Sequence, residues 1–394
     1  MPLSNSLKSA ASQFDQWARN DLFEKEHRLG TDLLEQAVDV HLENLYAELE
    51  LHDKLRQPTS AKTLAETLGF SDSAWIALDA MLMRLAKRRN LMEVRQDNDI
   101  LIYTALKAPE NRNAELADFR ARCQSMGEHY IAPMEFLEFG AEHFVRSMRD
   151  DHTFMDRVLT GQESEFSETW NRATNTDPLQ DVHGIMGAKA LDLLFEGGTI
   201  LEVGGGTGNG IRNNLLELDR SGKLSKLDSY VFTDVSMQFI VGTRNEFKGQ
   251  YPSTSCEWRL LNINKDFAKQ RIEADSADIV YGVNAAHIAE RTVDFLMECK
   301  RVLRPGGLVV FSERIRRHEH DMAPREIVLN QSSYHRTAAQ RHPEYRPAHA
   351  YLAREHWLRA CELAGYSEFE VWPSVESVAG YFPDQYAVVV VAKV

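Results

Sequence analysis

Thr199-Ile-Leu-Glu-Val-Gly-Gly-Gly-Thr-Gly-Asn-Gly210 decides the fold: an apolar run with one acidic residue leads into a cluster of glycines and then into a helical sequence. The apolar run predicts a β-strand, and the glycines predict the tight turn that connects this strand to the helix. Gly204, Gly206 and Gly208 lack a Cβ atom, so a ligand can lie against their backbone and their φ angles can be positive. The amide groups that open the following helix face the same crevice. The stretch therefore predicts a strand–turn–helix unit that holds a nucleotide-like ligand.

The spacing of the glycines excludes two common nucleotide-binding motifs. A dinucleotide fingerprint needs G-x-G-x-x-G, and Asn209 stands where its third glycine would be when the pattern starts at Gly204. A phosphate-binding P-loop needs Gly-Lys-Ser/Thr, and no lysine follows in the turn. The remaining pattern, acidic-x-Gly-x-Gly-x-Gly from Glu202 to Gly208, resembles the first motif of class I S-adenosylmethionine (SAM) methyltransferases. An ordinary glycine-rich turn between a strand and a helix is the alternative interpretation.

Polar residues follow the next two predicted strands. Asp234 ends the apolar run 229–233, and a carboxylate at the end of a second strand can accept hydrogen bonds from a ribose diol. A helix N-cap is the alternative role for this residue. Asn262 lies at the end of the run 258–263, where the methyltransferase resemblance implies a contact with the adenine edge. A turn residue is the alternative role for Asn262.

Two further strands bring a histidine and a glutamate to the same edge. The predicted strand 277–282 runs into Asn284 and His287, and the predicted strand 308–311 closes on Glu313. The alternation of strands and helices predicts a parallel, doubly wound sheet, whose ligands lie at the carboxyl ends of the strands. All the polar residues singled out so far fall at this edge, so the sequence predicts one site there. A packing or helix-capping histidine and a surface carboxylate are the alternative roles.

Length and composition bound the class of protein. The chain has 394 residues, a formal net charge of −14 and 43% hydrophobic residues, which favours two globular domains with sizeable cores. No apolar stretch reaches the ~18 residues of a membrane span, and the first residues lack the apolar core of a signal peptide. The four cysteines have no CxxC spacing and the histidines no metal-ligand spacing, so we expect reduced thiols, a cytoplasmic location, no membrane partner and no metal. The acidic balance argues against nucleic acid as a partner.

Residues 1–110 predict a helical, winged-helix-like domain. A short helix ending at Gly69 and a helix over 74–89 are followed by a hairpin of 91–94 and 100–103. Such folds often bind DNA, which requires surplus positive charge, and the basic and acidic residues of this unit cancel. The arrangement resembles the amino-terminal domain of many small-molecule methyltransferases, and this resemblance implies a dimerisation domain and hence a homodimer.

Residues 111–180 predict a helical connector and substrate cap, and residues 181–394 predict the catalytic domain. The connector is rich in aromatic residues, most of which are expected to pack in the core. Those in the stretch 130–144 and around Trp170 are expected to cover the substrate.

The resemblance becomes narrower within the catalytic domain. Asn284-Ala-Ala-His287 and Leu303-Arg-Pro-Gly-Gly-Leu-Val-Val-Phe-Ser-Glu313 are similar to segments of the C-methyltransferase domains of polyketide synthases and their nonribosomal relatives, as is the stretch 345–357. In those domains a His and a Glu form a catalytic dyad, which the resemblance places at His287 and Glu313. Winged-helix O-methyltransferases have a histidine and an acid in the same two places. The dyad therefore leaves open whether carbon or oxygen receives the methyl group.

The resemblance implies a class I, Rossmann-like α/β methyltransferase of specialised metabolism, of polyketide, nonribosomal or antibiotic type. It would use SAM to methylate an activated carbon of a β-keto acyl or similar substrate, free or bound to a carrier protein. His287 would act as general base and Glu313 would orient the imidazole. Methylation of a small phenolic or carboxylic metabolite at oxygen is the alternative, and a SAM-sensing winged-helix regulator is a remote one. Tyr334 and His335, after the fifth strand, are expected to contact the substrate. The expected cofactor-binding residues are Glu202, Gly204, Gly205, Gly206, Gly208, Asp234, Val235, Asn262, Ile263 and Asn284.

Overall fold

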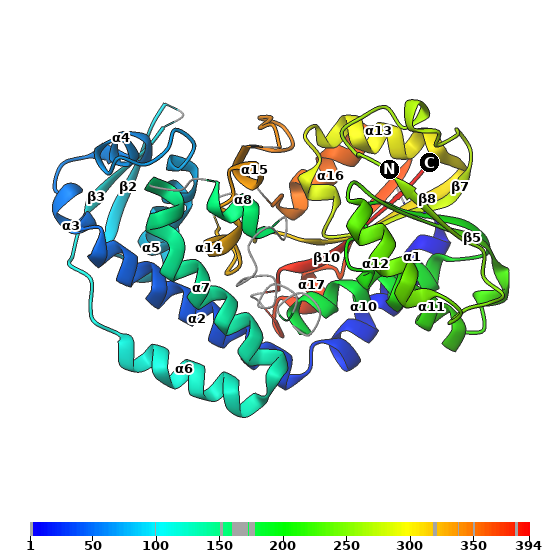
Figure 1. Cartoon of the computed structure of the whole chain (residues 1–394), viewed down its shortest axis with the longest axis horizontal. Helices are drawn as coiled ribbons and strands as arrows, with labels where there is room; N and C mark the ends of the chain where they lie inside the picture. The colour runs from blue at the N-terminus through cyan, green and yellow to red at the C-terminus, as the bar shows by residue number, and fades with distance from the viewer. Residues whose placement is uncertain are drawn as a thin grey trace.

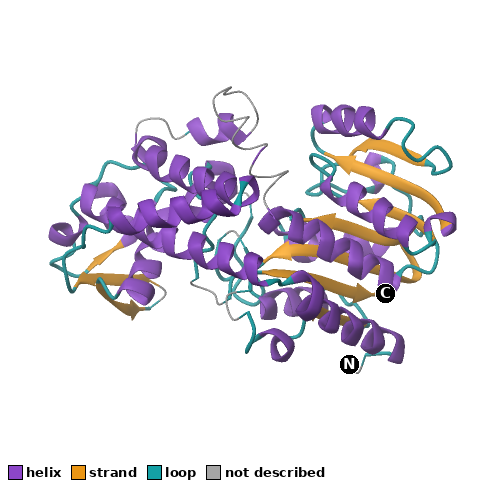
Figure 2. Cartoon of the chain, turned by 90° about the horizontal axis from the view of Figure 1, so that it is seen from below, coloured by secondary structure: helices purple, strands orange, loops and turns teal. Residues whose placement is uncertain are grey.

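The structure is a computed structural model of the chain. It describes residues 3–98, 100–149, 153–159, 172, 178–317, 321–337, 339–349, 351–382 and 385–394. An N-terminal helical part lies beside a part built on a β-sheet, and both chain termini lie on the sheet side (Figures 1 and 2). Among the helices in these ranges, none is long and apolar enough to cross a membrane.

A seven-stranded sheet with the order β6-β5-β4-β7-β8-β10-β9 forms the carboxyl-terminal part. The pairs that involve β10 are antiparallel, and the others are parallel. The chain moves outward from β4 to β5 and β6 and then returns to β7 on the other side of β4. The crevice above the carboxyl ends of β4 and β7 is therefore a topological switch point, where α/β proteins bind ligands. This is the predicted doubly wound α/β fold of class I methyltransferases. The strands are β4 (Gly198–Glu202), β5 (Leu227–Asp234), β6 (Cys256–Leu260), β7 (Ala277–Val283), β8 (Leu303–Arg314), β9 (Glu368–Trp372) and β10 (Ala387–Lys393).

Helices cover both faces of this sheet. Leu215 of α11 and Ile240 of α12 belong to one buried apolar cluster, and Phe295 of α13 and Trp357 of α16 belong to another. Each face of the sheet contributes alternate side chains to one of the two clusters, which is why the central strands are almost continuously apolar. The helices of this part are α10 (Pro178–Leu194), α11 (Asn209–Arg220), α12 (Met237–Phe247), α13 (Thr292–Val302), α14 (Glu326–Leu329), α15 (Ser333–Thr337), α16 (Arg354–Leu363) and α17 (Val375–Val378), with short 3₁₀ turns at Leu224–Lys226, Ala268–Gln270 and Ala286–Ile288.

The predicted helix–turn–helix–hairpin elements are present in the N-terminal part. The Ser60 hydroxyl accepts a hydrogen bond from the Thr63 N–H and caps the first helix of the unit. The hairpin joins a short strand in a sheet of order β1-β3-β2. The predicted role of residues 1–110 in dimerisation stays a prediction. The elements are α2 (Lys25–Glu48), α3 (Leu51–Lys54), β1 (Thr59–Ser60), α4 (Ala61–Thr67), α5 (Trp75–Arg89), β2 (Met92–Asp97), β3 (Ile100–Ala105), α6 (Asn113–Met126), α7 (Glu128–Arg149) and α8 (Phe154–Leu159).

The first helix, α1 (Asn5–Trp17), packs on the sheet rather than on the other N-terminal helices. A π-helical turn, Ala18–Leu22, connects it towards α2. α1 contacts α10 and β9, and it lies on the right in Figure 1 beside α10. The Asp15 carboxylate accepts hydrogen bonds from the N–H (2.9 Å) and hydroxyl (2.6 Å) of Ser374. The predicted domain boundaries at residues 110 and 180 stay a prediction.

A buried ion network ties the N-terminal helices to the segment that follows β8. The Arg84 guanidinium on α5 donates to Asp39 (2.6 Å) and to Glu35 (2.8 Å) on α2, and also to the Met322 carbonyl (2.5 Å). Removal of one member of such a network leaves a buried charge unpaired. The network therefore holds the segment after β8 against α2 and α5.

Helix α7 covers this same segment. It contacts α14, and a Cβ atom on Gly140 would lie 2.5 Å from a methyl group of Val328. The Gln331 amide donates to the carbonyls of Gly140 and Ile327. The stretch 130–144, predicted to cover the substrate, lies in α7 and is thus placed over the insertion after β8. Trp170, the other part of that prediction, lies outside the described residues.

Candidate active site

The glycine-rich turn leaves β4 and lies against the end of β7. The Val203 N–H donates to the Tyr281 carbonyl (2.8 Å), which keeps the chain in the sheet up to the first glycine. Gly204 then turns with a φ of +61°, and a Cβ atom there would lie 2.6 Å from the Cβ of Ala285. Gly206 also has a positive φ, +53°, and the space where its Cβ would stand is open. The turn is packed on one side and open on the other, as a ligand-binding turn requires.

Glu202 lies fully buried beneath this turn. Its Oε2 accepts a hydrogen bond from the Tyr230 hydroxyl (2.9 Å), and a Cβ atom on Gly210 would lie 2.0 Å from its Oε1. Burial raises the pKa of Glu202 to about 8, although the hydrogen bond from Tyr230 opposes the shift. Glu202 therefore supports the turn and the start of α11 from below. A contact between Glu202 and the cofactor stays a prediction.

Asp234, at the end of β5, holds the glycine turn in place. Its carboxylate accepts hydrogen bonds from the N–H groups of Gly206 (3.0 Å) and Ser236 (2.7 Å). Burial raises its pKa, and these backbone hydrogen bonds oppose the shift. Because each carboxylate oxygen has two lone-pair directions, the group can still accept hydrogen bonds from a diol. Val235, which follows, is 68% exposed, so an apolar surface lies beside this carboxylate.

Asn262 follows β6 and organises a turn. Its N–H donates to the Gln270 side chain (2.8 Å), and its Oδ1 accepts the N–H of Asn264 (2.9 Å). The side-chain oxygen of Asn262 therefore has the alternative role that the sequence offered, which is to stabilise a turn. Ile263 packs partly buried against the apolar cluster. A contact of these two residues with adenine stays a prediction.

The ends of β7 and β8 bring the predicted catalytic residues together. The two strands are parallel neighbours with Val283 opposite Ser312, so the residues that follow these two leave the sheet side by side. Asn284 has a φ of +49°, and its N–H donates to the Ser312 carbonyl (2.8 Å). Its Oδ1 accepts the N–H of Arg314 (2.8 Å). Asn284 thus joins the two strand ends by hydrogen bonds. Its contact with the cofactor stays a prediction.

His287 and Glu313 form a buried pair. The His287 Nδ1 lies 2.7 Å from the Glu313 Oε2, and Glu313 is fully buried. The other carboxylate oxygen, Oε1, accepts the N–H groups of Ala285 (3.0 Å) and Ala286 (2.8 Å). When the carboxylate is ionised it only accepts hydrogen bonds, and a neutral imidazole that donates to it from Nδ1 has its lone pair on Nε2. This geometry is compatible with a base and a group that orients it, and the catalytic roles of His287 and Glu313 stay a prediction. The surface carboxylate considered for Glu313 is wrong, because this side chain is enclosed.

Three side chains from the segment after β8 surround His287. Arg346 donates to the His287 carbonyl (2.6 Å), and the ring centres of Tyr351 and His335 lie 4.7 Å and 6.3 Å from the His287 ring. Burial lowers the pKa of His335 well below its ordinary value, and nearby positive charges add to the shift. The structure thus places His335 beside the dyad, and its contact with a substrate stays a prediction. The side chain of Tyr334 lies outside the described residues.

Sequence reasoning missed three of the side chains near the dyad. Tyr351 and Arg346 lie in the stretch 345–357 that resembles the synthase domains, so the resemblance carried a signal for them. His183 lies on α10 without any motif. It is fully buried, and among the described residues neither of its ring nitrogens has a hydrogen-bond partner. Burial lowers its pKa well below the ordinary value, and the charges of Arg314 and His287 add to the shift.

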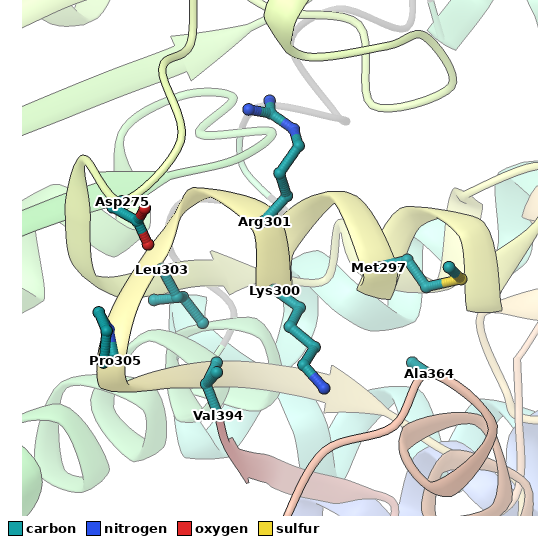
Figure 3. Close-up of a pocket in the computed structure, with 8 residues that line it drawn as sticks. All are labelled: Asp275, Met297, Lys300, Arg301, Leu303, Pro305, Ala364 and Val394. Carbon is teal, nitrogen blue, oxygen red and sulfur yellow. The ribbon is translucent and has the colours of Figure 1, made fainter.

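A cavity of about 510 Å³ lies at the start of β8, at the end of the parallel strands opposite to the dyad (Figure 3). It is lined by side chains from the last turns of α13, by Leu303 and Pro305 at the start of β8, and by Val394. Because Leu303 begins β8 and Glu313 is near its end, this cavity is almost a strand length from the dyad. We therefore assign it no part in the chemistry. Within the described ranges, no group of three or more His, Cys, Asp or Glu side chains is placed to hold a metal ion.

Comparisons with known proteins agree with this geometry. Residues 201–309 match a family model described as a methyltransferase domain. A highly reducing polyketide synthase of Pyrenophora dematioidea is 36% identical over 114 residues, which are 29% of this chain and 4% of that protein. The polyketide synthase-like protein Preu9 of Preussia isomera is 27% identical over 172 residues, 44% of this chain and 8% of that protein. The chain thus matches only a small part of the length of these relatives.

Solved structures share the fold over almost the whole chain. The CurJ carbon methyltransferase superposes with a TM-score of 0.76 at 18% identity, over 99% of this chain and 97% of that one. The DszA carbon methyltransferase gives 0.72 at 19% identity, over 98% and 93%. The citrinin polyketide synthase CMeT domain gives 0.70 at 15% identity, over 98% and 96%. Residues 201–309 thus match a methyltransferase domain, and the chain has the fold of the carbon-methyltransferase domains of polyketide synthases.

Proposed function

We propose that the chain transfers a methyl group from SAM to the α-carbon of a β-keto acyl thioester, with His287 as the general base. The observation that carries this proposal is the enclosed His287–Glu313 pair, 2.7 Å apart, next to the glycine turn. Gly204 packs against Ala285, two residues before His287. A donor lying on the turn would therefore be close to the base. The names of the structural relatives, carbon methyltransferases, favour carbon as the acceptor.

The residues of the crevice fit SAM. The open side of Gly206 leaves room for a ligand on the turn, and the Asp234 carboxylate has lone pairs left for the two ribose hydroxyls. The exposed Val235 offers an apolar contact to the adenine ring. A solved structural relative, the trans-methyltransferase CalH, is a complex with SAH, and it superposes with a TM-score of 0.60. When bound, SAM supplies a methyl group that is already activated on a sulfonium.

The protein then has to position the acceptor and remove one proton. Positioning two reactants in line can contribute an effective molarity of about 10⁵ M or more. The His287 Nε2 accepts the proton of the α-carbon, and a positioned base of this kind contributes about 10²-fold to 10⁴-fold. Glu313 holds the Nδ1 proton and stabilises the imidazolium that forms. Because two backbone N–H groups fix the other oxygen of Glu313, the imidazole is oriented before the substrate binds.

Methyl transfer to matched acceptors tests the proposal. The protein is incubated with SAM and either acetoacetyl-N-acetylcysteamine, acetoacetyl bound to an acyl carrier protein, or a small phenol. Mass spectrometry detects a methylated product, and NMR places the methyl group on carbon or oxygen. We expect C-methylation of the thioesters, with the carrier-bound form preferred, and none of the phenol. Methylation of the phenol alone would instead establish the O-methyltransferase alternative.

A further inference from the structure

A second, much smaller cavity lies between the N-terminal helices and the ends of β8 and β10. Its volume is about 10 Å³, which is room for about one water-sized group. One wall is apolar and the other is polar and cationic. The side chains that matter are the apolar Leu34, Leu137 and Pro324 and the polar Arg314, Arg325 and Tyr386.

Arg314 is a buried cation with an unused donor. It is 2% exposed, and its guanidinium carbon lies 4.5 Å from the centre of the Tyr386 ring. Among the residues that the structure describes, its Nη2 has no hydrogen-bond partner and no carboxylate forms an ion pair with it. A buried charge without a partner is destabilising. An anionic oxygen in the cavity would relieve this cost.

The carboxylates near the cavity have other partners. Glu313 binds His287 and two backbone N–H groups. Glu326 pairs with Arg316 at 2.6 Å, and Glu35 pairs with Arg84 at 2.8 Å. The protein therefore supplies neutralising charge to the neighbouring arginines, while the Arg314 guanidinium is left facing the cavity.

Arg314, which lines the cavity, lies next to the dyad along the chain. Arg314 directly follows Glu313 on β8. The Tyr351 ring lies 4.7 Å from the His287 ring. Burial raises the pKa of Tyr351 to about 12, and the charges of Arg314 and Arg325 oppose this shift. Tyr351 thus lies beside the base, and the charges of both arginines act on its hydroxyl.

We propose that Arg314, with Arg325 on the same wall, binds the negatively charged oxygen that forms on the acceptor when His287 removes its proton. This inference rests on the proposed function. The cavity has room for about one oxygen atom, so only the enolate oxygen would enter it, and the carbon that carries this oxygen would lie outside. Fixed cations placed where charge develops are a strong source of catalysis.

The step balances without a further reactant. The electrons of the breaking C–H bond form the enolate, and its negative charge lies on the former carbonyl oxygen beside Arg314. The proton goes to His287. The α-carbon then forms its bond to the methyl group, the carbonyl is restored, and the electron pair of the broken carbon–sulfur bond stays on sulfur. The imidazolium afterwards releases its proton to water.

The test measures the acidity of a bound acceptor. Acetoacetyl-N-acetylcysteamine is bound in the presence of SAH, so no methyl transfer occurs, and its enolate is followed by ultraviolet absorption as pH is varied. An opposite charge typically shifts a pKa by about 1 to 3 units. We expect the pKa of the bound thioester to be about two units higher in Arg314→Met than in the wild type. The turnover number with SAM should fall about 100-fold, and the affinity for SAM should not change.

Matched variants separate this role from a structural one. Arg314→Lys keeps a positive charge and should keep most of the acidity of the bound thioester. Lys300→Met removes a cation at the remote cavity of Figure 3 and should leave the acidity unchanged. If Arg314→Met does not bind SAM, Arg325→Met repeats the test at the second arginine, with a higher pKa of the bound thioester expected.

The outcomes distinguish the two proposals. C-methylation by the wild type, together with an unchanged pKa of the bound thioester in Arg314→Met or in Arg325→Met, would overturn the role of the arginines alone. A wild type that neither enolises nor methylates the thioester would overturn the proposed function, and this inference with it.

Discussion

Replacement of Glu313 by glutamine should block the base, His287, without disturbing the site around it. The carboxylate accepts three hydrogen bonds: two from backbone N–H groups at Oε1 and one from His287 at Oε2. Glutamine has almost the same shape. Its carbonyl oxygen can accept the two N–H groups of Ala285 and Ala286, which places its NH₂ group against the imidazole.

The size of the expected loss in turnover number follows from this geometry. A donor facing Nδ1 forces the proton onto Nε2, so the nitrogen that should accept the substrate proton is blocked. The reverse orientation of the amide would set two buried N–H donors against an NH₂ group, at a cost of about 1 to 3 kcal/mol for each unsatisfied donor. The corresponding change in a Ser-His-Asp triad lowers the turnover number about 10⁴-fold. We expect a loss of about 10³-fold to 10⁴-fold for Glu313→Gln, or about 4 to 5.5 kcal/mol in the activation barrier.

Steady-state kinetics with saturating SAM and acetoacetyl-N-acetylcysteamine measures this loss, and calorimetry measures the affinity for SAM. The turnover number should fall while the dissociation constant of SAM stays the same. His287→Ala is the matched control, since it removes the base directly and should lose a comparable factor. A Glu313→Gln enzyme with more than a tenth of the wild-type turnover would refute the orienting role of the carboxylate.

Three further changes test other parts of the structure. Asp234→Ala should weaken SAM binding by about 1.5 to 3 kcal/mol per lost hydrogen bond to the charged group, as calorimetry would show; an unchanged affinity would remove Asp234 from the binding site. Glu202→Gln should alter the pH dependence of stability, because the folded state holds the Glu202 proton up to about pH 8 while the unfolded chain releases it near pH 4.5. The wild type loses stability as pH rises through this window, so the variant should gain relative to it in denaturant titrations, and parallel curves would contradict the burial of this acid. Arg84→Met leaves Glu35 and Asp39 buried without their cation, and should lower the free energy of unfolding by about 3 to 5 kcal/mol.

A control accompanies the ion-network variant. Lys54→Met breaks an ion pair with Glu50, whose side chain is 75% exposed, and an exposed pair of this kind contributes about 0 to 1 kcal/mol. Equal effects of Lys54→Met and Arg84→Met on the unfolding free energy would show that the buried network does not stabilise the fold.

The sequence was informative where backbone geometry itself requires particular residues. The glycine turn needs positive φ angles, and Gly204 and Gly206 have them. The apolar runs before Asp234 and Glu313 became β5 and β8, two parallel strands of one sheet with β4 and β7 between them, so the order of strands along the chain was enough to place those residues at one edge. His287 and Glu313 could be placed at this edge because strand ends are predictable from such patterns, and the resemblance then assigned them as a dyad.

The sequence was less informative where tertiary packing determines the end of a strand, its place in the sheet or the burial of a side chain. Strand β6 ends at Leu260 rather than at Ile263, because Asn262 already forms a turn with Asn264. The antiparallel strand β10 was not located, although the apolar run 388–391 is typical of a buried strand. The burial of Arg314 depends on helices from the other end of the chain, and no local pattern indicates it.

The central claim is that the donor on the glycine turn and the imidazole of His287 meet at one acceptor carbon. A crystal structure of the protein with SAM and a non-enolisable analogue of a β-keto thioester tests it most directly. We expect the methyl carbon of SAM to lie about 3 to 3.5 Å from the acceptor carbon. We expect the His287 Nε2 to lie at a similar distance from the same carbon. SAM bound away from the turn, or an imidazole whose Nε2 faces away from the acceptor, would contradict the account.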